Sequence, residues 1–183
     1  MQLPPVTILT IMNQYFILLL LLGVSVALDD EQQEFSTVGG TSCPSPFNTV
    51  GGKCIYADVV NRGTWQEMRE LCQGLADRYS VPDLVKVDSG DFFVDLIHHI
   101  HAYDWQDRYL WIGASDGDHE GVWTWLDGSI VLMGTPFWAN GGCNDVQEPQ
   151  GGTSENCSVL DPYYHMYFND FNCEAKLNGI CEY

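Results

Sequence analysis

The sequence predicts an α+β fold in which two helices precede a set of short strands arranged around one large loop. Apolar residues recur at helical spacing only between residues 64 and 100. Beyond residue 105, short apolar runs alternate with Asp-Gly and Gly-Gly pairs, which are typical of strands and turns. Residues 140–155 are Gly-rich and have almost no hydrophobic period. A loop of that length inside a compact domain is usually functional.

The first helix is expected to begin at Thr64, because Thr64 and Glu67 have the spacing of a capping box. Pro82 closes this helical region. The apolar residues that share one face of this helix are Trp65, Met68, Cys72, Leu75 and Tyr79.

A second helix is expected to open at Asp88 or Ser89. Phe93, Leu96, Ile97 and Ile100 form its buried stripe. The two clearest strand signals follow it, at Tyr109–Ile112 and at Val122–Leu126.

Composition restricts the class of partner. The chain has 183 residues, enough for one domain with short appendages, and its 25 acidic and 7 basic residues give a net charge of −18. Phosphate binding needs a basic face, so a nucleic-acid partner is disfavoured. Adhesion to anionic membrane surfaces is disfavoured for the same reason. A surplus of carboxylates suits hard cations such as calcium.

The N-terminal residues predict export. Residues 15–26 read YFILLLLLGVSV, a run of about a dozen apolar residues, whereas a bilayer span takes roughly 20. Small residues precede a cleavage position after Ala27, so residues 1–27 are expected to be a signal peptide. An uncleaved anchor is the competing interpretation. Residues 28–42 are expected to be a flexible acidic leader, and residues 43–183 the folded domain of a secreted, extracellular protein without membrane insertion.

Seven cysteines follow the predicted signal, and in a secreted protein most of them should be oxidised. The number is odd, so at least one is unpaired or bonds to another chain. The spacing does not select a pairing. A zinc cluster is disfavoured because the chain contains no C-x-x-C pair. The cysteines are Cys43, Cys54, Cys72, Cys143, Cys157, Cys173 and Cys181.

Carboxylate and amide side chains are paired three times between residues 148 and 173. Their oxygens are hard ligands, which favours calcium over zinc or copper. Calcium takes 6–8 ligands, so positions would remain for water or a ligand hydroxyl. Taken singly, each pair could be an ordinary acidic turn. A cis peptide bond before Pro149 would turn its two neighbours toward one point. The five candidate ligands are Glu148, Gln150, Glu155, Asn169 and Asp170.

These features together resemble the C-type lectin-like domain, from about Cys43 to Tyr183. The residues that carry the resemblance are Trp111-Ile112-Gly113, Glu148-Pro149-Gln150, Glu155-Asn156-Cys157 and Phe168-Asn169-Asp170, with Cys173 and Cys181 behind them. The resemblance implies two helices packed on short antiparallel sheets, with a long calcium-binding loop. It also implies the disulfides Cys72–Cys181 and Cys157–Cys173, together with Cys43–Cys54, the mark of the long form of the domain. Cys143 is left unpaired, and it either links two chains into a homo-oligomer or is a buried free thiol.

The resemblance also implies a mechanism. Calcium (Ca2+), held by the five candidate ligands, binds two neighbouring hydroxyls of a sugar ring, while the same carboxylates accept and the amides donate hydrogen bonds. The acid-first order of Glu148-Pro149-Gln150 goes with mannose-like sugars, although Gln150 replaces the usual Asn and is one methylene longer. Phe168 replaces the usual Trp. An auxiliary calcium site would use Asp116, Glu120, Glu155 and Asn156, although Gly151 stands where another carboxylate is expected.

These features leave three candidate functions. The first is a secreted, calcium-dependent carbohydrate-binding lectin without catalytic activity, which recognises mannose-like glycans on microbial surface polysaccharides in innate immunity. The second is a calcium-independent protein-binding module on the same scaffold. The third, a small secreted metalloenzyme, is disfavoured because the sequence offers no positioned nucleophile or general base.

Overall fold

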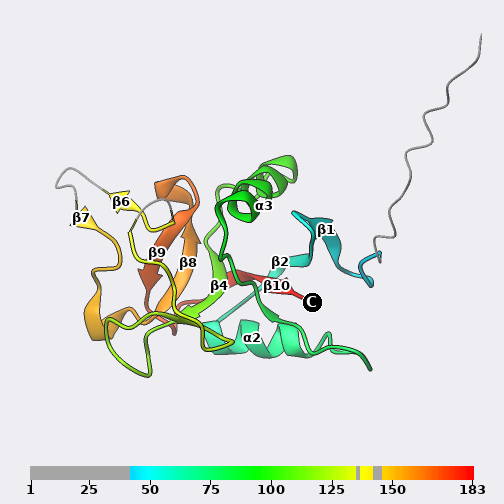
Figure 1. Ribbon diagram of the computed structural model, residues 1–183, viewed down its shortest axis with the longest axis horizontal. Helices are drawn as coiled ribbons and strands as arrows, with labels where there is room; N and C mark the ends of the chain where they lie inside the picture. Colours follow the sequence, from blue (N-terminus) through cyan, green and yellow to red (C-terminus); the bar gives the residue numbers. More distant parts are fainter. Residues whose placement is uncertain (1–41, 135–136, 142–145) are drawn as a thin grey trace, which may run out of the picture. The chain divides into compact units, whose positions relative to one another are not determined.

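The computed structural model describes residues 42–134, 137–141 and 146–183 (Figure 1). The predicted signal peptide, almost all of the predicted leader and Cys143 lie outside the described residues. Two helices and a mixed sheet make up the domain, in agreement with the predicted α+β class.

The main sheet has the strand order β1-β2-β10-β4-β8-β9, with β3 paired to β10 and β5 paired to β4. Every strand pair is antiparallel, as expected, except β10 with β4, which is parallel and makes the sheet mixed. The reason is that the last strand of the chain inserts between two earlier strands. The bounds are β1 Asn48–Val50, β2 Lys53–Gly63, β3 Asp83–Leu84, β4 Leu110–Ser115, β5 Thr124–Trp125, β8 Cys157–Asp161, β9 Tyr167–Phe171 and β10 Leu177–Glu182.

Helix α2 (Trp65–Gln73) begins with the predicted capping box. The Thr64 hydroxyl accepts from the Glu67 N–H at 3.1 Å, and the Glu67 carboxylate accepts from the Thr64 N–H at 2.8 Å. The helix ends at the Gly74 cap, earlier than predicted, because glycine has poor helix propensity. Tyr79 was therefore wrongly placed on its buried face, and the structure leaves Tyr79 exposed.

Helix α3 (Gly90–Ala102) is capped by Ser89, whose hydroxyl accepts from the Phe92 N–H at 3.2 Å. Phe93, Leu96 and Ile100 of the predicted stripe are buried, and Ile97 is partly buried. Phe92 is buried as well, although the sequence pattern did not single it out.

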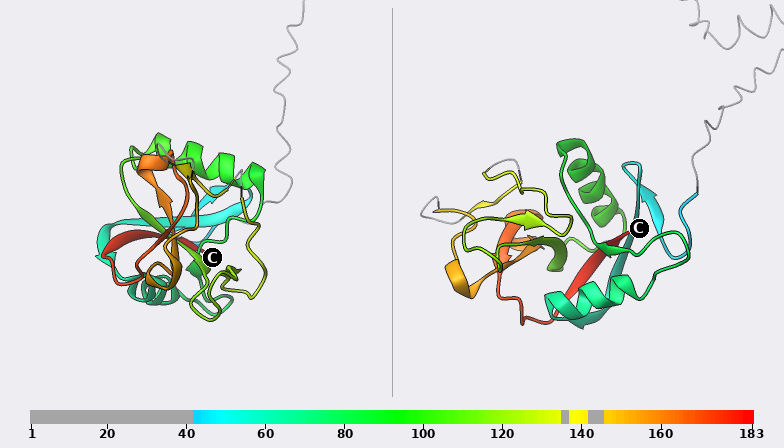
Figure 2. Two further views of the ribbon diagram at one scale, coloured as in Figure 1. Left: turned by 90° about the vertical axis from the view of Figure 1, so that its left-hand side faces the viewer. Right: turned by 60° about the horizontal axis from the view of Figure 1, so that its bottom comes forward.

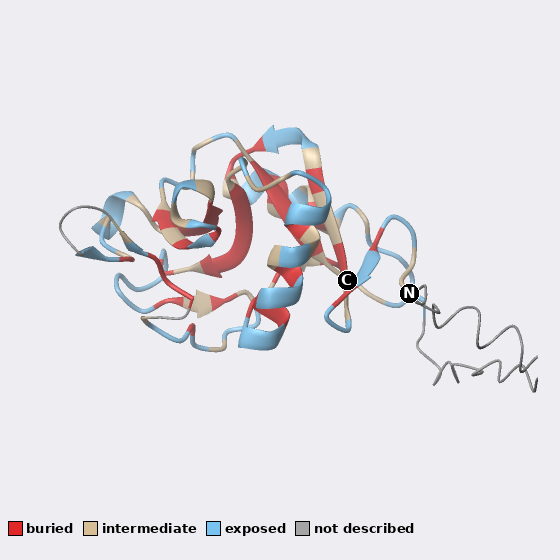
Figure 3. Cartoon of the chain, turned by 90° about the horizontal axis from the view of Figure 1, so that it is seen from above, coloured by how far each residue is buried: buried red, intermediate tan, exposed pale blue. Residues whose placement is uncertain are grey.

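The two helices lie on opposite faces of the sheet (Figures 1 and 2). Strand β4 shows how the sequence builds both layers, since neighbouring residues of a strand point to opposite faces. Leu110 and Ile112 belong to the cluster that contains the α3 residues, whereas Trp111 belongs to the cluster of α2. Both sides of β4 are therefore buried, and Figure 3 shows buried residues gathered in the strands of the domain.

Gly113 follows Trp111 and Ile112 because a side chain would not fit there. A Cβ atom on Gly113 would lie 2.5 Å from the carbonyl oxygen of Leu84. This close approach allows the Gly113 N–H to donate to the Val85 carbonyl oxygen at 2.9 Å. The Trp-Ile-Gly motif thus joins the central strand to the segment after β3.

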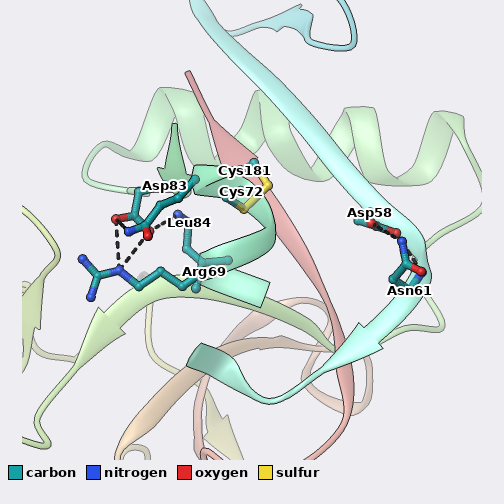
Figure 4. Close-up of a disulfide and its surroundings, with 8 residues drawn as sticks. Asp58, Asn61, Arg69, Cys72, Asp83, Leu84 and Cys181 are labelled. Carbon is teal, nitrogen blue, oxygen red and sulfur yellow. Dashed lines mark hydrogen bonds and ion pairs between the residues drawn. A yellow bond between two sulfur atoms is a disulfide. The ribbon is translucent and has the colours of Figure 1, made fainter. Parts of the chain in front are cut away.

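Three disulfides connect these elements, in the pairing that the resemblance implies. Cys72–Cys181 ties α2 to β10, close to the ion pair of Arg69 with Asp83 (Figure 4). Cys157–Cys173 links the start of β8 to the segment after β9. The third is Cys43–Cys54, which holds the first described residues against β2.

None of the helices in the described part of the chain is long and apolar enough to span a bilayer.

Candidate functional site

The long loop between β5 and β8 is attached to the sheet through β9. The Phe168 N–H donates to the Phe137 carbonyl oxygen at 2.7 Å, and the Ala139 N–H donates to the Phe168 carbonyl oxygen at 2.8 Å. The Phe168 ring is fully buried and stacks on Phe137 at a centroid distance of 5.5 Å. Phenylalanine thus fills the position at which the resemblance expects tryptophan, and it anchors the loop beside Asn169 and Asp170.

Ala139, in the same loop, positions the first predicted ligand, Glu148. The Glu148 N–H donates to the Ala139 carbonyl oxygen at 2.9 Å, so Ala139 bridges β9 and Glu148. The Gln147 side-chain amide donates to the Ala139 carbonyl oxygen at 2.8 Å and reinforces this arrangement. The Glu148–Pro149 peptide bond is cis. A short hairpin, β6 (Asn140–Gly141) with β7 (Val146–Gln147), leads into this segment at the loop end of the domain (Figure 1).

Glu148 and Asp170 are both buried, with exposed fractions of 3% and 2%. Each keeps one buried carboxylate oxygen, Oε2 of Glu148 and Oδ1 of Asp170, without a hydrogen-bond partner. An unsatisfied buried carboxylate oxygen is energetically costly and calls for an explanation such as a missing ion. These two oxygens are available to a cation.

The carboxylates of Glu148, Glu155 and Asp170 repel one another. Burial, together with the negative charge of Asp170, raises the pKa of Glu148 to about 7. Burial and the same neighbouring charge also raise the pKa of Glu155. Desolvated like charges that disfavour each other's ionisation are stabilised by a divalent cation, which offsets the repulsion.

Gly151 allows the loop to close tightly over Asp170 and Glu155. Its N–H donates to Oδ2 of Asp170 at 2.5 Å. A Cβ atom on Gly151 would overlap Oε2 of Glu155, so any side chain would displace that carboxylate. The glycine that replaces an expected carboxylate is thus required by the packing of Glu155.

Asn169 is held by a residue of the neighbouring strand β8. Its side-chain Nδ2 donates to Oδ2 of Asp161 at 2.9 Å, and Asp161 is itself buried. The remaining predicted ligand, Gln150, is exposed at the edge of the loop. The structure therefore places Glu148, Glu155 and Asp170 as electrostatic neighbours, orients Asn169 through Asp161, and leaves the Gln150 side chain in solvent.

The predicted auxiliary site also contains unsatisfied buried oxygens. Oδ1 of Asp116 and Oδ1 of Asn156 are buried without partners, and the Asp116 N–H donates to the Asn156 carbonyl oxygen at 3.3 Å. Oδ2 of Asp116 accepts from the Gly121 N–H at 2.8 Å. Glu120 is exposed.

The candidate ligand oxygens are of the type that calcium prefers, although they do not form a complete coordination sphere. Four of the seven buried side-chain polar atoms that lack a partner in the described residues belong to the two predicted sites. Across those same residues, no group of three or more His, Cys, Asp or Glu side chains is placed so that it could hold a metal ion.

Two contributors were missed from the sequence. Asp161 stands directly before Pro162, at the end of a strand, and its contact with Asn169 depends on the β8–β9 register. Gly151 contributes a backbone N–H rather than a side chain. For Asp161, the only sequence signal is a single carboxylate in a strand that has no other charged residue.

The chain is similar to known proteins in sequence and in fold. Residues 61–183 match the family model described as the lectin C-type domain. The human protein "C-type lectin domain family 17, member A" is 29% identical over 141 residues, which cover 77% of this chain and 32% of that protein. The chain thus spans about a third of the length of that relative.

Solved structures share the fold. The carbohydrate-recognition domain of the mouse scavenger receptor C-type lectin is 26% identical, has a TM-score of 0.58, and is matched over 77% of this chain and 95% of that one. A calcium-independent type II antifreeze protein is 21% identical, with a TM-score of 0.56 and coverage of 77% and 93%. The second likeness concerns the fold alone.

Proposed function

Since the chain belongs to the C-type lectin domain family, we propose that it is a secreted, non-catalytic lectin that binds carbohydrate through calcium at Glu148, Gln150, Glu155, Asn169 and Asp170. The observation that carries the proposal is the pair of buried, unsatisfied carboxylate oxygens on Glu148 and Asp170. Both belong to residues that the sequence predicted as calcium ligands, and hydrogen bonds through Ala139 join their segments.

Each side chain has a distinct task in this proposal. Calcium, when bound, supplies direct coordination of two neighbouring sugar hydroxyls. The carboxylates of Glu148 and Glu155 accept hydrogen bonds from those hydroxyls, while the amides of Asn169 and Gln150 donate. Asp170 holds the loop through the Gly151 N–H and offers its free oxygen to the metal.

The acid-first order at Glu148 and Gln150 supports selectivity for mannose-like sugars, and microbial surface polysaccharides are the proposed targets. The mouse structural relative is described as a carbohydrate-recognition domain, which supports the ligand class. Three disulfides and an apolar N-terminal run support an extracellular location.

The test is retention of the purified chain on immobilised mannose with calcium and after addition of a chelator. Retention with calcium and release by the chelator are expected, with immobilised galactose as the comparison resin. Retention that ignores the chelator would contradict calcium dependence.

The second candidate is a calcium-independent binding module. Its support is the absence of an assembled carboxylate cluster among the described residues. A titration with calcium alone discriminates between the two, since this candidate predicts neither heat of binding nor a change in thermal midpoint.

A further inference from the structure

We propose that Asp161 is a positioning residue. It orients the side-chain amide of Asn169 so that the amide oxygen faces the metal. The inference rests on the proposed function, because it assumes that Asn169 is a calcium ligand. It adds a residue outside the ligand set, on a fully buried strand in which Asp161 is the one charged residue.

The β8–β9 register brings the two side chains together. Val159 lies opposite Asn169, and Asp161 lies opposite Tyr167. Asp161 and Asn169 are therefore diagonal neighbours on one face of the strand pair, within reach of polar side chains. The observed contact is Nδ2 of Asn169 donating to Oδ2 of Asp161 at 2.9 Å.

The chemistry of the amide makes this contact directional. An Asn side chain has one acceptor oxygen and one donor nitrogen, and a half-turn about its last bond exchanges them. Calcium binds only the oxygen. An ionised carboxylate only accepts, so Asp161 holds the nitrogen of Asn169 on its own side and leaves the oxygen to face away. The second hydrogen on that nitrogen stays free for a sugar hydroxyl.

Asp161 is itself held in place. Its exposed fraction is 2%, and its other oxygen, Oδ1, accepts from the Tyr163 N–H at 2.8 Å. Both oxygens of the carboxylate thus face hydrogen-bond donors. A neutral amide of the same shape could satisfy only one of them, because its second polar atom is a donor.

The decisive variant is Asp161→Asn. If the introduced amide keeps the Tyr163 contact, its nitrogen faces Nδ2 of Asn169, and two donors meet. Asn169 relieves this conflict by a half-turn that points its nitrogen at the metal position. Loss of an outer-shell partner typically weakens metal affinity about 10–100-fold. We expect that loss in a calorimetric titration of the full chain with calcium alone.

The matched control is the exchange Asp161→Asn with Asn169→Asp, which keeps the net charge. The introduced amide then donates to the new carboxylate, whose other oxygen faces the metal. Calcium affinity should return to within a few-fold of the unaltered chain. Mannose retention should stay weak, because the amide donor to the sugar is gone. Recovery of calcium affinity is the result that supports the positioning role, whereas the weak mannose retention follows from the loss of the Asn169 amide alone.

The outcomes separate the inference from the proposed function. Unchanged calcium affinity in Asp161→Asn, or a double variant as weak as the single one, would overturn the positioning role. Absence of calcium binding by the unaltered chain would overturn the proposed function and the inference with it. Should Asp161→Asn not fold, the unaltered calcium-free chain still provides a test by NMR. One Asn169 amide proton should be hydrogen-bonded to the Asp161 carboxylate, and a freely exchanging amide would contradict the inference.

Discussion

Glu148 and Asp170 lie on different segments, are both buried, and each keep one carboxylate oxygen without a partner. The first belongs to the long loop and the second to β9, and hydrogen bonds through Ala139 and Phe168 hold the segments side by side. The fold thus holds two desolvated carboxylates near each other, which raises the pKa of one of them. This repulsion destabilises the folded state, and binding of a cation would relieve it.

Asp170→Asn tests the metal site with little change of shape. It removes the negative charge while keeping an oxygen that can accept from the Gly151 N–H. Calcium should raise the thermal midpoint of the unaltered chain, since a ligand that binds only the folded state stabilises it. We expect at least a tenfold loss of calcium affinity in the variant, and loss of mannose retention.

The matched control for that variant is Glu174→Gln, which neutralises an exposed carboxylate after β9. It should keep the calcium-induced shift of the thermal midpoint. Equal shifts in Asp170→Asn and in the unaltered chain would show that Asp170 is not a ligand.

The raised pKa of Glu148 predicts a pH dependence. Between the unfolded value of 4.5 and the folded value of about 7, the calcium-free folded state binds more protons than the unfolded state. The contribution of Glu148 to stability is therefore full below pH 4.5 and is lost as the pH rises through 7. Protons compete with calcium in the same range, so calcium affinity should rise between pH 5 and pH 7.5.

Glu148→Gln isolates this contribution. Burial lowers the pKa of His99, which works in the opposite direction because a neutral imidazole is favoured in the folded state. Comparing the variant with the unaltered chain cancels that effect. With chelator present, the thermal midpoint of Glu148→Gln relative to the unaltered chain should be higher at pH 7.5 than at pH 5. A difference that does not depend on pH would contradict the raised pKa.

The sequence patterns predicted where the two helices begin, because contacts between residues close in the sequence determine those positions. The capping box of Thr64 and Glu67 and the Ser89 cap are formed within a few residues, and both helices begin at the predicted places. The contact of Asp161 with Asn169 was not predictable, because it depends on strand register and not on spacing. The parallel β10–β4 pair arises in the same way, from a strand that arrives last and from far along the chain.

Asp116→Asn tests the auxiliary site. Asp116 is outside the principal ligand set, and its Oδ1 is buried and unsatisfied. We expect calcium stoichiometry, measured by calorimetry, to fall from two ions to one, while mannose retention persists at a higher calcium requirement. A stoichiometry of one in the unaltered chain would eliminate the auxiliary site and leave the principal one standing.

The disulfides should differ in their effect on stability. Cys72 and Cys181 are separated by 109 positions, whereas Cys43 and Cys54 are separated by 11. The longer loop restricts the unfolded chain more, by about 2 kcal/mol in the chain-entropy model. Replacing Cys72 and Cys181 by Ala should therefore lower the free energy of unfolding in urea more than replacing Cys43 and Cys54. The reverse order would show that contacts near the N-terminus dominate.

Gln150→Asn tests the origin of sugar selectivity. Gln150 is exposed, and its extra methylene places its amide farther from the loop backbone than the amide of Asn would be. A shorter side chain loses less rotamer freedom on binding and presents its donor nearer the metal. Mannose affinity, measured by competition on a glycan panel, should rise about 3–10-fold, since a gain near 1 kcal/mol corresponds to about fivefold. Galactose affinity should not follow, because the acid-first order is unchanged. An equal gain for both sugars would show that position 150 affects the metal rather than the choice of sugar.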